Sequence, residues 1–84
     1  MNDELKYLFS VALHEKLKRK IKGKIFCKVY GEKLIITIEK IGGITYTMTI
    51  HDFSDKVLNG YTTDYALYEI LKEYHSFISK TFFY

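Results

Sequence analysis

The chain has 84 residues, of which 48% are hydrophobic and 27% are charged, and its formal net charge is +3. This length suits one domain with one core, so we expect residues 1–84 to form a single domain. Such a core leaves little room for a deep catalytic cleft, and the composition is that of a globular chain. Neither an enzyme nor a wholly disordered protein is therefore expected.

The single cysteine, Cys27, cannot form a disulfide within the chain. No apolar signal segment follows the first methionine, and no run approaches the roughly 20 apolar residues of a membrane helix. These features predict a reduced, cytoplasmic protein. The abundance of lysine, isoleucine and tyrosine is typical of AT-rich genes, such as those of low-GC bacteria and their phages. For a phage-encoded protein, the compartment would be the host cytoplasm.

An amphipathic helix is predicted from about residue 3 to residue 22, because apolar residues recur at steps of three and four. They are Leu5, Leu8, Phe9, Ala12, Leu13, Leu17 and Ile21. Asp3 is expected to be the N-cap, because its carboxylate can accept hydrogen bonds from the free amides of the first turn. Gly23 is expected to end the helix in the left-handed conformation.

Three segments with strict alternation follow, at 25–30, 34–39 and 44–50. Alternating β-branched and aromatic residues predict half-buried antiparallel strands, and the links at Gly31-Glu32 and Gly42-Gly43 predict a meander. One face of this sheet is apolar, with Ile25, Cys27, Val29, Leu34, Ile36, Ile38, Tyr46 and Met48. The opposite face carries Lys24, Phe26, Lys28, Tyr30, Ile35 and several threonines.

Two helices are predicted to close the chain. The first is short, contains Phe53 and ends at Asn59-Gly60, and Asp52 is expected to be its N-cap. The second begins near Thr62 or Thr63, and its inner stripe is Leu67, Ile70, Leu71, Tyr74, Phe77 and Ile78. The order α-β-β-β-α-α predicts an α+β fold. Both long helices would pack on one face of the three-stranded meander, and the other face would be open.

Two surfaces are candidates for binding. The first is a basic cluster formed by Lys16, Lys18, Arg19, Lys20, Lys22 and Lys24. It can neutralise phosphates or dock an acidic protein surface. A solvated helix end that complements the helix dipole explains it equally well. The second is the open sheet face, where Phe26 and Tyr30 offer rings for stacking on bases, and Lys24 and Lys28 offer charges for phosphates. A covering loop or a dimer interface is the alternative there.

Potential metal ligands and nucleophiles are few: Cys27, His14, His51, Asp52 and His75. None of them shows the short paired spacing of a local zinc motif. The chain also lacks a nucleophile elbow and a glycine-rich phosphate loop. We therefore expect no catalytic residue, no metal and no cofactor, and we expect Cys27 to fill the core as a small apolar residue.

Aromatic residues beyond the core stripe add apolar surface near the end of the chain. They are Tyr65, Tyr68 and the terminal Phe82-Phe83-Tyr84. Aromatic rings are enriched in protein interfaces, so one hypothesis is a homodimer that uses this surface. The other is that the tail folds back onto the edge of the sheet.

The order of one helix, three strands and one helix from Asp3 to about Ser79 resembles the double-stranded RNA-binding domain. That family carries a lysine-rich cluster at the start of its final helix. In this chain the corresponding segment is Thr62-Thr63-Asp64-Tyr65-Ala66, with an acid and no lysine. The resemblance therefore implies a topology, and it does not carry the family's RNA contacts over to this chain.

The chain also resembles small proteins of Firmicute phages and prophages, in its size, its composition, the segment Asp52 to Gly60 and the ending Tyr74 to Ile78. It is similar to small anti-CRISPR inhibitors of type II Cas9, some of which share its order of elements. This resemblance implies a non-enzymatic protein that blocks a host effector by steric occlusion.

The best-known Cas9 inhibitors of this kind are acidic DNA mimics, whereas this chain is basic. Contact with guide RNA or with an acidic protein patch is therefore expected in place of a DNA channel. The alternative function is a small protein that binds RNA or single-stranded DNA in phage replication or regulation.

Overall fold

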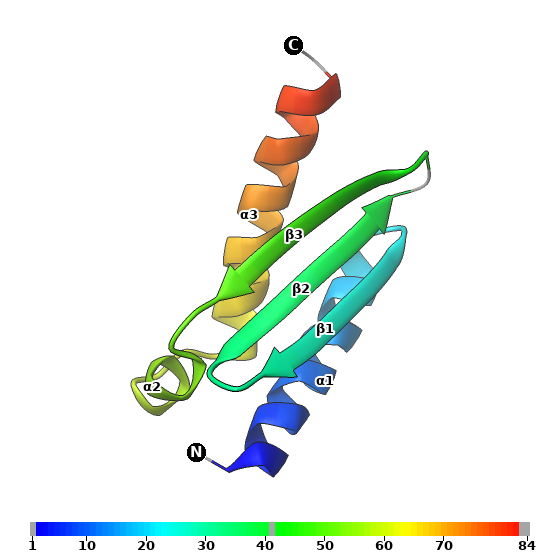
Figure 1. The fold of residues 1–84 in the computed structure, drawn as a ribbon. Coiled ribbons are helices and arrows are strands. Elements are labelled where there is room, and N and C mark those ends of the chain that lie inside the picture. Colours follow the sequence, from blue (N-terminus) through cyan, green and yellow to red (C-terminus); the bar gives the residue numbers. More distant parts are fainter. Residues whose placement is uncertain (1, 41, 83–84) are drawn as a thin grey trace.

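The computed structural model describes residues 2–40 and 42–82, except for the side chain of Phe82. Its elements are α1 (Asp3–Lys20), β1 (Lys24–Tyr30), β2 (Lys33–Lys40), β3 (Ile44–Ile50), α2 (Phe53–Leu58) and α3 (Thr63–Phe82). The strands form one antiparallel sheet in the order β1-β2-β3. Helices α1 and α3 lie behind this sheet, and its other face has no helix over it (Figure 1). The predicted α+β fold is confirmed.

The strand register follows from the alternation in the sequence. Tyr30 pairs with Lys33 across the two-residue turn Gly31-Glu32, and the pairing continues without a bulge to Lys24 and Glu39. This register places every second residue of β2 against the helices, and Leu34, Ile36 and Ile38 are fully buried there. Cys27, Val29 and Met48 on the two edge strands are half-buried, whereas Ile25, Tyr46 and Ile50 on the same strands are buried.

The core lies between the sheet and the two long helices. Its buried apolar members are Leu13, Leu17, Ile21, Ile25, Leu34, Ile36, Ile38, Tyr46, Ile50, Phe53, Ala66, Ile70 and Tyr74. Full burial of one such leucine, isoleucine or phenylalanine stabilises a fold by about 1.5–3 kcal/mol. Residues from all six elements contribute, so the sheet and the helices hold one another in place.

The first half of α1 departs from the predicted stripe. Leu5 and Leu8 are each 52% exposed, whereas Lys6 and Ser10 are buried. The N-terminal turns of α1 lie beside the β1–β2 turn, at the end of the sheet (Figure 1). At that place α1 meets the main-chain oxygen of Gly31, which accepts a hydrogen bond from Lys6. A buried donor is favoured over an apolar side chain there.

Two predicted N-caps are wrong in detail. Asn2 caps α1, since its Oδ1 accepts a 2.8 Å hydrogen bond from Leu5 N, and Asp3 is the first helical residue. Asp52 stands at the N-cap position of α2 with a left-handed backbone (φ 51°), but its side chain makes no capping hydrogen bond. The predicted start of α3 is confirmed, because Thr62 Oγ1 accepts from Tyr65 N at 3.1 Å.

The end of α1 also differs from the prediction. The helix stops at Lys20, and Ile21 already has an extended backbone. Gly23 has φ +151°, so it is not a left-handed helix cap. A Cβ at Gly23 would lie 2.5 Å from Glu39 O. The glycine is therefore required by the close approach of two main chains where α1 leads into β1.

Helix α3 extends to Phe82. Tyr65 and Tyr68 on this helix are 56% and 62% exposed. Phe83, Tyr84 and the side chain of Phe82 lie outside the described residues, so the predicted aromatic interface concerns Tyr65 and Tyr68 alone. Within residues 2–40 and 42–82, no helix is both long and apolar enough to cross a membrane.

Candidate binding surface

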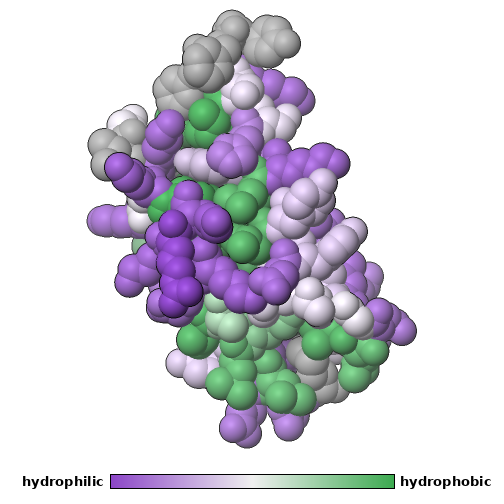
Figure 2. All heavy atoms as spheres, turned by 180° about the vertical axis from the view of Figure 1, so that it is seen from behind, coloured by the Kyte–Doolittle hydropathy of each residue, from purple (hydrophilic) through white to green (hydrophobic). Residues whose placement is uncertain are grey.

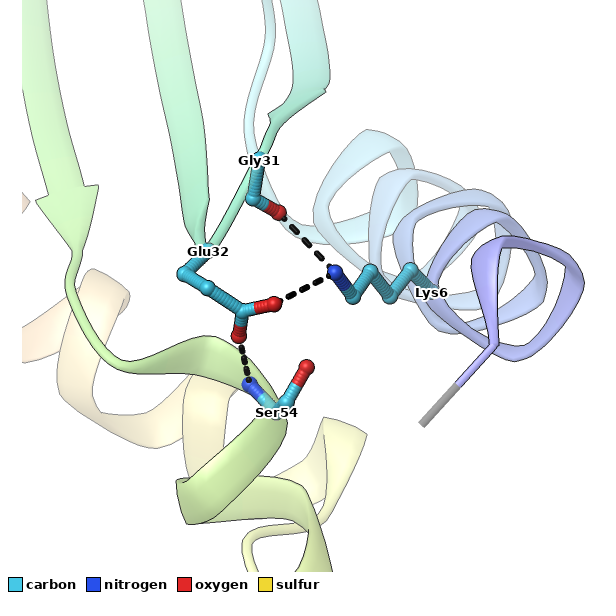
Figure 3. A network of polar contacts seen from close by, with 4 residues as sticks. All are labelled: Lys6, Gly31, Glu32 and Ser54. Atoms are coloured by element: carbon cyan, nitrogen blue, oxygen red, sulfur yellow. Dashed lines mark hydrogen bonds and ion pairs between the residues drawn. The ribbon is translucent and has the colours of Figure 1, made fainter.

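A polar network holds the β1–β2 turn between α1 and α2 (Figure 3). Lys6 Nζ donates to Gly31 O at 3.1 Å and to Glu32 Oε1 at 2.7 Å. The other Glu32 carboxylate oxygen accepts from Ser54 N at 3.2 Å, and Glu32 O accepts from Phe53 N at 2.9 Å. Glu32 thus binds the free amides at the start of α2, the role expected of Asp52.

Hydrogen bonds from Lys6 and Ser54 lower the pKa of Glu32 from 4.5 to about 2. The carboxylate is therefore charged at every pH at which the protein is expected to work. Sequence reasoning missed this network, because a lysine and a glutamate 26 positions apart give no local signal. The network of Lys6, Gly31, Glu32 and Ser54 affects binding only indirectly, because it fixes the end of β1 relative to α1.

The helix-free face of β1 carries four exposed residues, Lys24, Phe26, Lys28 and Tyr30, which we name the sheet platform. Phe26 is 52% and Tyr30 is 60% exposed, and Lys28 Nζ lies 5.0 Å from the centre of the Tyr30 ring. The predicted placement of these four residues on the open face is confirmed. The sheet platform combines rings and cations at alternate positions of one strand.

Four further basic residues, Lys18, Arg19, Lys20 and Lys22, are exposed around the end of α1, and we name them the basic helix end. Because α1 lies behind the sheet, this group and the sheet platform belong to different layers (Figure 1). The two groups are linked where the chain passes from α1 into β1, between Lys22 and Lys24. The sheet platform then continues from there to Tyr30 at the other end of β1.

The helix side of the molecule is divided in two (Figure 2). Hydrophilic residues surround a narrow apolar strip over its middle, and a broader group of apolar residues lies at the end that holds the start of α1. Exposed Leu5 and Leu8 contribute to that apolar end. The last turn of α1 is basic and its first turn carries Asp3 and Glu4, so a polyanion would meet favourable charge at the C-terminal end of α1 and not at its N-terminal end.

Lys16 differs from the other residues of the predicted basic cluster. Its Nζ lies 2.6 Å from Asp64 Oδ1 and donates to Thr63 Oγ1 at 2.7 Å. It therefore joins α1 to the start of α3. The contact also accounts for the acid at the start of α3, where the double-stranded RNA-binding family has lysines.

A groove of about 810 Å³ runs between α1 and the outer edge of β1. We name it the β1-edge groove, and it is lined by Asp3, Tyr7, Ser10, Val11, His14, Ile25, Phe26, Cys27, Lys28, Val29 and Gly31. At one end, His14 Nε2 makes a 2.9 Å hydrogen bond with Ile25 O. The groove was not predicted, because it depends on where α1 crosses the edge strand.

The residue types considered for catalysis or metal binding do not converge. Within residues 2–40 and 42–82, no group of three or more His, Cys, Asp or Glu side chains is placed to hold a metal ion. Cys27 is half-buried and packs against the core, as expected, and it also stands in the wall of the β1-edge groove. Burial raises the pKa of its thiol from 9.0 to about 11, so the reactive thiolate is disfavoured.

Comparison of this chain with protein-family models, with curated proteins and with solved structures gave no match. Function is therefore inferred from the surfaces of the molecule itself.

Proposed function

We propose that this chain is a non-enzymatic binding protein that covers a functional surface of a polyanionic partner. Its contacts would be the basic helix end and the sheet platform. The observation that supports this most is the exposure of Phe26 and Tyr30 beside Lys24 and Lys28 on a sheet face without a helix over it. Two large exposed rings on one strand favour an interaction site, because ring burial gives much contact area for little loss of entropy.

Charge favours an anionic partner. Lys24 and Lys28 lie on one side of β1, and the four exposed cations of the basic helix end lie beyond its start. The only acid in β2 is Glu39, which stands opposite Lys24. Each cation that approaches a phosphate releases a counterion, so such a surface gains affinity without reading sequence. The rings would add stacking on unpaired bases or packing against a protein.

The resemblance to phage proteins suggests the particular partner. We propose a host defence ribonucleoprotein of the type II Cas9 class, which this chain would inhibit by steric occlusion. A basic surface suits exposed guide RNA or an acidic patch of the nuclease, and it does not suit a DNA-binding channel lined by cations.

A second candidate function is direct binding of RNA or single-stranded DNA in phage replication or regulation. The position of Lys28 Nζ 5.0 Å from the Tyr30 ring favours it, because ring and cation already form one contact unit. Both candidate functions use the same residues. If the chain binds nucleic acid directly, its affinity for free RNA or single-stranded DNA should equal its affinity for a nucleoprotein.

Charge reversal tests the proposal. The variant Lys18→Glu/Arg19→Glu/Lys22→Glu changes exposed residues only, so it should fold. We expect it to lose binding to guide-RNA-loaded Cas9 and inhibition of DNA cleavage. The control Lys56→Glu/Lys72→Glu/Lys80→Glu makes the same change in net charge on α2 and α3 and should keep both activities.

Equal inhibition by the two triple variants would refute the assignment of this surface. Loss of binding to free RNA and to the loaded nuclease in parallel would support the second function. Absence of wild-type binding to the loaded nuclease would refute the Cas9 partner, and binding to free RNA would then decide whether the polyanion surface itself stands.

A further inference from the structure

The outer edge of β1 presents main-chain groups to the β1-edge groove. In an antiparallel ladder, residues alternate between bonding their neighbour strand and pointing away from it. Tyr30 and Lys33 close the two-residue turn as a bonded pair, so Tyr30, Lys28 and Phe26 bond β2. The N–H and C=O groups of Val29 and Cys27 therefore point outward, away from the sheet.

Side chains of α1 satisfy this edge at its two ends only. His14 Nε2 bonds Ile25 O, and Lys6 Nζ bonds Gly31 O. Ile25 is one of the outward-pointing residues of β1, in agreement with the register, and Gly31 lies in the turn just beyond the ladder. Between them, Cys27 and Val29 have no outward hydrogen bond to any described residue. An edge with free donors and acceptors is a template for pairing with another strand.

The two sides of this edge differ in chemistry. On the helix side stand Tyr7 and Val11 of α1, 64% and 41% exposed, together with the half-buried Cys27 and Val29. On the open side stands Lys28, with Lys24 further along the same strand. A strand in the groove would place alternate side chains against these two surfaces, because residues directly opposite in a ladder point to the same face.

We propose that the β1-edge groove binds an extended protein segment in which apolar and acidic residues alternate. The segment adds to the sheet as a fourth strand, antiparallel to β1. Its apolar side chains contact Tyr7 and Val11, and an acidic side chain stands opposite Lys28. This inference goes beyond the proposed function, because it concerns the edge of the sheet and holds for a partner with or without nucleic acid.

A second copy of this chain fits the edge less well. Pairing the free residues Cys27 and Val29 with Val29 and Cys27 of a copy places Lys28 directly opposite its own counterpart, and like charges so placed are destabilising. If the copy is shifted so that Cys27 pairs with Cys27, Ile25 must also join the ladder, but its carbonyl oxygen is already bonded to His14. An acidic partner strand that pairs with Cys27 and Val29 places a carboxylate opposite Lys28 and so avoids the like-charge contact.

The test uses the ¹⁵N-labelled full chain and a capped heptapeptide of alternating glutamate and valine. We expect saturable shifts of the Cys27 and Val29 amide signals and slower exchange of these two amides with solvent. A peptide of alternating lysine and valine should not bind. N-methylation of the valine amides, which would face β1, should abolish binding, whereas N-methylation of the glutamate amides should not.

Matched variants locate the apolar contact. Val11→Glu should weaken binding of the glutamate–valine peptide more than about tenfold. Leu8→Glu also replaces an exposed aliphatic residue of α1 with glutamate, but outside the groove, and it should have little effect on peptide binding. Unchanged exchange of Cys27 and Val29, or equal binding of both methylated peptides, would overturn the proposal. Protection of these amides that grows with protein concentration, without peptide, would also overturn it, because a second copy would then occupy the edge.

Discussion

Replacing Gly23 with alanine tests how tightly the basic helix end is joined to the sheet platform. Gly23 has φ +151°, a value that costs an L residue about 1–3 kcal/mol. The added Cβ would lie 2.5 Å from Glu39 O. Glu39 is paired with Lys24, so its oxygen cannot retreat without moving the end of β2. Forcing atoms into such a contact adds about 1–3 kcal/mol, and the expected total loss is about 2–6 kcal/mol.

Gly43→Ala is the matched control. Gly43 also has a positive φ of 87°, but nothing lies within 4 Å of its Cβ position. Gly43→Ala should lose only the stability that the positive φ costs, without the steric contribution. The free energies of unfolding of the two variants, measured by urea unfolding with circular dichroism, should therefore differ by about 1–3 kcal/mol. In thermal unfolding, each kcal/mol corresponds to a Tm shift of about 4–8 °C for a domain of this size. Equal losses in both variants would refute the steric account of the α1–β1 junction.

Two further predictions concern single ionisable groups. The folded protein lowers the pKa of Glu32 from 4.5 to about 2, so its stabilising effect is present above pH 4.5 and is lost as the pH falls toward 2. The difference in urea midpoint between wild type and Glu32→Gln should shrink over that range, and a constant difference would contradict the network around Lys6. Because burial raises the pKa of Cys27 to about 11, its thiol should react slowly with an aromatic disulfide reagent in the folded protein and rapidly in urea. Fast reaction of the folded protein would count against this environment.

The strands were predictable because their side chains repeat with period two, and that period is fixed by backbone geometry. The same parity placed Phe26, Lys28 and Tyr30 on the open face, and the structure agrees. The sheet platform was therefore predictable from the sequence, although nothing in the pattern says what binds there.

The first half of α1 was not predictable in the same way. Its apolar spacing gave a stripe through Leu5 and Leu8, but the helix turns Lys6 inward because Gly31 O at the β1–β2 turn accepts its hydrogen bond. Ser10 is buried as well, and its hydroxyl donates to Tyr7 O of the same helix. Gly23 was assigned to a helix cap, since a glycine after a basic helix end is typical of one. Its real role depends on Glu39, 16 positions away, and local pattern carries no such information. The β1-edge groove was not predictable either, because it depends on the position of α1 relative to β1.

A salt titration of wild-type binding to single-stranded and structured RNA, guide RNA included, tests the central claim of a polyanion-binding surface most directly. If four phosphates are neutralised, the logarithm of affinity should fall with the logarithm of salt concentration at a slope of about −3 for a single strand. The Lys18→Glu/Arg19→Glu/Lys22→Glu variant should bind weakly and show a shallower slope than the control triple variant. Absence of binding to every RNA at low salt, or a slope near zero, would contradict the claim.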